Sequence, residues 1–98
     1  MAQYQSSYRT LTLEACLEEV IRLGDHYFLS GGGEGWRASD LLAWLERKHP
    51  ALLSLPVALV PPDATGYGAV FEVDLEGEPI TDAPLYRLER RKPAVEPF

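Results

Sequence analysis

The segment that decides the fold is SGGGEGWRASDLLAWLERKHP, residues 30–50, where a glycine-rich break is followed at once by an amphipathic stretch. Four glycines fall within five positions, 31–35, and glycine can turn a chain without steric cost. Apolar residues then recur at positions 41, 42, 44 and 45, the spacing of one helical face. The pattern predicts a turn over 30–35 and a helix over 38–49, because Pro50 disfavours a helical conformation at His49.

A second helix is predicted before the glycines, over residues 13–28. Thr12 is a suitable N-cap, and apolar residues recur from Leu13 to Phe28 at i, i+3, i+4 and i+7. Residues 50–55, PALLSL, are compatible with a short third helix that Pro56 limits to about two turns.

Strands are predicted in the last third of the chain. Residues 69–76, AVFEVDLE, alternate with a period of two, and a second alternating run covers 84–90. Positions 69, 71, 73 and 75 would share the inward face. The acidic segment between the runs contains Gly and Pro, so the pair predicts a β-hairpin with a long tip.

Length and composition indicate one globular domain. The chain has 98 residues, of which 46% are hydrophobic and 24% charged. We expect a flexible arm over 1–11, a single domain over 12–90 and a flexible tail over 91–98. The fold class predicted is α+β, with two to three helices packed on a small antiparallel β-hairpin or sheet.

Cysteine usage and hydropathy favour a cytoplasmic location without membrane insertion. Cys16 is the single cysteine, so no intramolecular disulfide can form. The first ten residues lack the apolar stretch of a signal peptide, and the longest apolar run, LPVALVPP, is far shorter than a membrane span.

The charge is acidic overall but unevenly distributed. Fifteen acids against nine bases give a net charge of −6, which opposes contact with the phosphate backbone of nucleic acids. Residues 63–86 contain six acids and no Lys or Arg, whereas residues 87–92, RLERRK, carry four bases and one acid. A basic edge therefore remains beside the acidic segment.

Motifs for cofactors, metals and catalysis are weak. Residues 33–38, GEGWRA, match a dinucleotide loop only in form, since no buried strand precedes them and no acid follows about 20 residues on. DLEGE at 74–78 lacks the glycine and glutamate spacing of an EF-hand. Cys16, His26 and His49 do not have the spacing of metal ligands. We expect no enzyme activity, no cofactor and no small-molecule ligand.

The order of helix, Gly-rich connection with Trp36, the helix RASDLLAWLERKHP, a possible third helix and a long-tipped hairpin resembles a winged-helix domain over residues 12–90. The resemblance implies that 50–55 is the third helix and 76–83 the wing. A third helix of that family usually reads DNA. Here residues 50–60, PALLSLPVALV, contain no charged, Asn or Gln side chain, and the wing is acidic.

The function predicted is a non-catalytic protein-interaction or regulatory module that binds another protein or self-associates. It follows from the missing catalytic motifs, the acidic loop and the apolar segment PALLSLPVALVPP. The alternative is a winged-helix DNA-binding regulator that uses the basic edge. The candidate partner contacts are Trp36, Leu55, Val57 and Leu59; the candidate nucleic-acid contacts are Arg37, Arg47, Lys48, Arg87, Arg90, Arg91 and Lys92.

Overall fold

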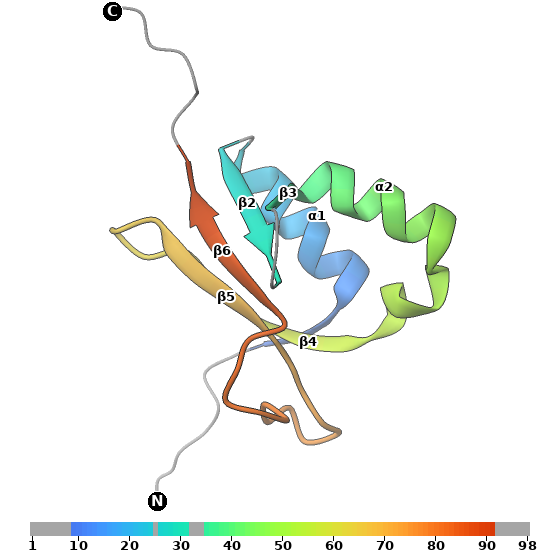
Figure 1. Cartoon of the computed structure of the whole chain (residues 1–98). Helices are drawn as coiled ribbons and strands as arrows, with labels where there is room; N and C mark the ends of the chain where they lie inside the picture. The colour runs from blue at the N-terminus through green and yellow to red at the C-terminus, as the bar shows by residue number, and fades with distance from the viewer. Residues whose placement is uncertain (1–8, 25, 32–34, 92–98) are drawn as a thin grey trace, which may run out of the picture.

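The computed structural model describes residues 9–24, 26–31 and 35–91. Two α-helices, a short 3-10 helix and six strands make up this part, so the predicted α+β class is confirmed (Figure 1). The elements in chain order are β1 (Thr10–Thr12), α1 (Leu13–Leu23), β2 (Tyr27–Ser30), β3 (Trp36–Arg37), α2 (Ala38–Lys48), η1 (Pro50–Ser54), β4 (Pro56–Val60), β5 (Tyr67–Glu72) and β6 (Tyr86–Arg90).

All six strands join one antiparallel sheet in the order β1-β4-β5-β6-β2-β3. Both helices lie on the same side of this sheet (Figure 1). Each strand exposes alternate residues to that side, and the register brings Leu59 opposite Val70, and Val70 opposite Tyr86. The next row joins Leu88 to Leu29 and Leu29 to Trp36. The core therefore lies between the sheet and the helix pair.

The core combines helix and strand residues that lie far apart in the sequence. From α1 and α2 it takes Leu17, Val20, Leu41 and Leu45, all four of which the helical spacing predicts to be buried. The sheet adds one apolar side chain from each of the strands β2, β4, β5 and β6. The complete buried cluster is Leu13, Cys16, Leu17, Val20, Leu29, Ala38, Leu41, Leu45, Val57, Val70 and Leu88.

Helix α1 ends five residues earlier than the sequence predicts. Gly24 has φ 123°, a conformation that favours glycine, and its amide donates to the Ile21 carbonyl to close the last turn. Tyr27 and Phe28 then pair with β6 as strand residues. The prediction of helix through Phe28 was wrong because both residues also fit the helical period, while their strand partners lie some 60 positions further along the chain.

Residues 50–60 divide into two different elements. Pro50–Ser54 form the 3-10 helix η1, and Pro56–Val60 form β4, which lies between β1 and β5 in the sheet. Pro56 lacks an N–H, but its carbonyl accepts from the Val73 amide. The segment 50–55, which the resemblance assigns to a third helix, is thus the 3-10 helix η1, and the strand β4 follows it directly.

The predicted hairpin is present as β5 and β6, paired from Tyr67 with Glu89 to Val70 with Tyr86. Its inward face differs from the alternation read from the sequence. Val70 is fully buried, Phe71 is half-buried, and Leu75 lies beyond the end of β5. The prediction that 69, 71, 73 and 75 share the inner face was therefore wrong, except that Val73 is buried.

The sequence-based domain boundaries fall partly outside the described residues. Thr10 and Leu11, assigned to the N-terminal arm, pair with β4 as part of β1. Residues 1–8 of the arm, 92–98 of the tail and 32–34 of the predicted glycine turn lie outside the described ranges.

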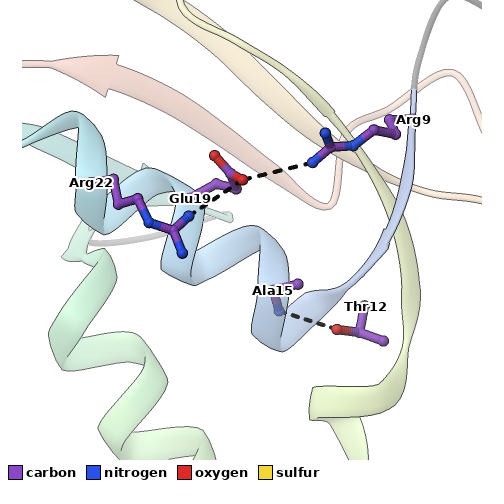
Figure 2. Close-up of polar contacts among 5 residues, drawn as sticks. All are labelled: Arg9, Thr12, Ala15, Glu19 and Arg22. Atoms are coloured by element: carbon purple, nitrogen blue, oxygen red, sulfur yellow. Dashed lines mark hydrogen bonds and ion pairs between the residues drawn. The ribbon is translucent and has the colours of Figure 1, made fainter.

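Thr12 caps α1, as its position in the sequence predicts. Its Oγ1 accepts a hydrogen bond from the Ala15 amide at 3.1 Å (Figure 2). Replacing Thr12 with alanine leaves that amide without its side-chain partner, and we expect the free energy of unfolding to fall by about 1 kcal/mol. Urea titration followed by circular dichroism measures the change. Thr12→Ser keeps the hydroxyl and should behave like the parent chain; an equal loss in both variants would contradict the capping role.

Candidate functional site

The segment between β5 and β6, residues 73–85, is called here the acidic loop. Its tip is a tight turn over 74–78, organised by Asp74. One carboxylate oxygen of Asp74 accepts from the amides of Glu76 and Glu78 at 2.9 and 3.0 Å. The Asp74 amide donates to the Glu78 carbonyl, and Gly77 donates to the Asp74 carbonyl. Gly77 has φ 83°, which this turn requires.

The turn displays an apolar side chain to solvent. Leu75 is 100% exposed, and Ile80, on the returning arm of the loop, is 53% exposed. Glu76 and Glu78, which lie between these two residues in the sequence, are also exposed. A β-bridge between Val73 and Pro79 closes this turn at its base, so Leu75 projects from an ordered turn. An ordered display reduces the conformational entropy that binding would otherwise cost.

A groove opens on the helix-covered side of the sheet, at the β1 edge. Its apolar lining consists of Leu11 from β1, Leu59 from β4, Pro61 just after β4 and Leu23 at the end of α1. Its volume is about 300 Å³. Leu23, the last residue of α1, is 44% exposed. We call this site the α1 groove. Apolar side chains that remain accessible in a concave site are typical of a binding surface.

Two charged side chains, Arg9 and Glu19, belong to the lining of the α1 groove, and Arg22 adjoins it through Glu19. Glu19 on α1 pairs with Arg9 at 3.6 Å and with Arg22 at 3.3 Å (Figure 2). These exposed ion pairs contribute little to stability. A guanidinium has five N–H donors, so pairing with one carboxylate leaves donors for another. The three groups together carry a net charge of +1.

The predicted partner contacts lie in different places. Leu59 lines the α1 groove, and Leu55 is half-buried between η1 and β4. Trp36 is half-buried in β3, with its ring centroid 5.5 Å from that of Trp44. Val57 is fully buried beneath α1, so its prediction as a partner contact was wrong. Alternation along β4 turns Val57 toward the core, which the apolar run alone does not reveal.

The predicted nucleic-acid contacts divide into two groups. Arg47 and Lys48 lie in the last turn of α2, whereas Arg87, Arg90 and Arg91 lie on or just after β6. Arg37 is the N-cap residue of α2, and as part of β3 it pairs with Phe28 of β2. Lys92 lies outside the described ranges. The six described positions therefore come from separate elements of the chain.

Two of these arginines meet at Phe28. The guanidinium carbon of Arg91 lies 4.6 Å from the Phe28 ring centroid, and that of Arg37 lies 5.7 Å away. Arg91 also pairs with Glu89 at 3.7 Å. A shallow cavity of about 430 Å³ adjoins this cluster and is lined by Phe28, Gly35, Trp36, Arg37 and Asp40. The site combines an aromatic face with two cations.

The single cysteine of the chain, Cys16, is buried in the core. Burial raises the pKa of the Cys16 thiol to about 12, with a further contribution from the charge of Glu19, so the thiol stays protonated at neutral pH. Within 9–24, 26–31 and 35–91, no three His, Cys, Asp or Glu side chains gather as a set of metal ligands. Nor does this part of the chain contain a helix long and apolar enough to cross a membrane.

Comparison with protein-family models, with curated proteins and with solved structures finds no match to this chain. Inference about function therefore depends on the surfaces described above.

Sequence reasoning missed both the exposed leucine and the groove. Leu75 was assigned to an inward strand face because it continues the alternation of 69–73. The signal that distinguishes it is the DLEGE sequence around it, since Asp, Gly and alternating acids favour a turn rather than a strand. The α1 groove joins residues from three separate elements, so no local pattern predicts it.

Proposed function

We propose that this chain is a non-catalytic interaction module that binds a protein through the tip of the acidic loop. The observation that carries the proposal is Leu75, which is wholly exposed on an ordered turn. Single exposed apolar residues are common on protein surfaces. This one stands out because a hydrogen-bonded turn presents it, with Ile80 exposed on the same loop.

The chemistry of the tip defines the partner surface. An exposed leucine gains free energy when an apolar pocket removes it from water. Glu76 and Glu78 lie beside it, and the surrounding segment 63–86 contains no Lys or Arg. A partner with basic groups around its pocket would therefore complement the two carboxylates. The partner is therefore a protein with an apolar pocket and a positively charged rim, either another chain or a second copy of this one.

Replacing Leu75 with serine is expected to abolish partner binding. The turn depends on Asp74 and Gly77, so the substitution removes the apolar anchor without removing the turn's hydrogen bonds. We expect at least a ten-fold loss of partner recovered from native lysate, or of self-association measured by light scattering. Leu52→Ser is the matched control, because Leu52 is 42% exposed on η1, away from the loop.

Two results would overturn the proposal. A parent chain that is strictly monomeric and also retains no protein from lysate has no partner to explain. A chain whose Leu75→Ser variant retains the same partner with the same affinity does not use the tip.

We also propose that the chain is not an enzyme and that it is related to winged-helix domains. The proposal that the chain is not an enzyme is supported by Cys16, whose buried thiol is protonated at neutral pH and is therefore a weak nucleophile. The winged-helix relationship is supported by the α1, α2 and hairpin order, but a helix pair with a hairpin occurs in many α+β folds. The proposed binding through the acidic loop does not depend on the winged-helix relationship.

A second candidate function is nucleic-acid binding at Phe28, favoured by Arg37 and Arg91 beside its ring. Aromatic faces with adjacent arginines stack on bases and contact phosphates. If this function holds, duplex or single-stranded DNA should bind at low salt and weaken steeply as salt rises. The double variant Arg37→Ala, Arg91→Ala should then lose binding, while Arg47→Ala retains it. Fluorescence anisotropy without binding at low salt would eliminate this candidate.

A further inference from the structure

We propose that the partner is a second copy of this chain, with Leu75 of one copy in the α1 groove of the other. The inference rests on the proposed function and names the partner for it. Both halves of the contact are present in one chain: an apolar tip with flanking carboxylates, and an apolar groove with flanking guanidinium groups.

The two surfaces match in size and apolar character. The α1 groove holds about 300 Å³, and an apolar cavity of about 150 Å³ already accepts a molecule as large as benzene. Leu11, Leu23 and Leu59 supply aliphatic walls for the leucine side chain. Leu23, exposed in the single chain, would become covered.

The charges of the two surfaces also match. Arg9 and Arg22 share the single carboxylate of Glu19. Arg9 lines the groove and Arg22 adjoins it, so the three groups together leave one positive charge in excess beside the groove. Glu76 and Glu78 are exposed at the tip, and their carboxylates can accept from the remaining guanidinium donors. Glu19 itself opposes the incoming carboxylates, which limits the electrostatic gain and leaves the apolar contact dominant.

The chain's own tip does not fill its own groove. Gly77 lies against Thr10, since a Cβ on Gly77 would be 3.1 Å from the Thr10 hydroxyl. Thr10 and Leu11 are neighbours in β1 and therefore point to opposite faces of the sheet, and Leu11 lines the groove. The tip is thus on the other side of β1 from the groove. The contact must form between molecules, either exchanged reciprocally in a dimer or repeated head to tail.

Complementation between two defective variants tests this pairing. Leu75→Ser removes the tip and keeps the groove, while Leu23→Glu places a carboxylate in the groove and keeps the tip. Both positions are exposed, so both variants should fold. Sedimentation velocity of the purified full chain should show concentration-dependent association, weakened at least ten-fold in each variant alone. An equimolar mixture should form a mixed species, because one intact tip and one intact groove remain.

The control is Leu52→Glu, which adds a carboxylate at an exposed apolar position outside both surfaces and should associate like the parent chain. Failure of the mixture to associate, or an undiminished association of Leu23→Glu, would overturn the pairing. A monomeric parent chain that still captures a lysate protein through Leu75 would also overturn it, while the proposed interaction function stands. A monomeric chain that captures nothing removes both.

Discussion

Replacing Leu45 with alanine is expected to lower the free energy of unfolding by about 2–5 kcal/mol. Leu45 lies on α2, is 1% exposed, and belongs to the cluster between the helices and the sheet. Truncation removes buried methyl groups and leaves a cavity that the surrounding side chains fill only in part. Because a small domain is stable by only about 5–15 kcal/mol, this loss is a large share of the total.

Guanidinium titration of Leu45→Ala against the parent chain measures this loss, provided circular dichroism shows that the variant is folded in water. Leu52→Ala is the control, since it truncates an exposed leucine on the neighbouring η1 and should change stability by well under 1 kcal/mol. Similar losses in both variants would mean that Leu45 does not have the buried environment seen here.

The second large effect is expected at Gly68, the second residue of β5. A methyl group there would collide with the backbone carbonyl oxygen of Val60 and come within 3.0 Å of Pro61 and Pro62 backbone atoms. Backbone atoms of the adjacent strand cannot move aside as a side chain can. We expect Gly68→Ala to lower the free energy of unfolding by about 1–3 kcal/mol or more.

Local propensity alone predicts the opposite sign, since alanine restricts the unfolded chain and usually stabilises where the backbone permits it. Thermal and urea unfolding of Gly68→Ala therefore separate the tertiary contact from the intrinsic preference. Tyr67→Thr, at the exposed neighbouring position of β5, exchanges one strand-forming residue for another and is the control. A stabilised Gly68→Ala chain would show that β4 and β5 are not packed as described.

The candidate site was predictable only in part. The acidic character of the loop is visible in the composition of 63–86, and Leu59, one of the predicted partner contacts, lines the α1 groove. Four of the basic candidates were chosen as neighbours in the sequence 87–92, whereas the structure brings Arg91 together with the distant Arg37 at Phe28. Positions 37 and 91 meet because β2 lies between β3 and β6 in the sheet.

The sequence by itself determined the elements whose stabilising interactions are local. α2 follows from its apolar stripe and the proline after it, and the start of α1 follows from the Thr12 cap, because these contacts join residues at most four positions apart. Only the tertiary structure decided that 27–30 and 56–60 are strands and that Val70, not Leu75, faces the core. Strand pairing depends on backbone hydrogen bonds to distant segments, and a shift of one residue exchanges the two faces of a strand.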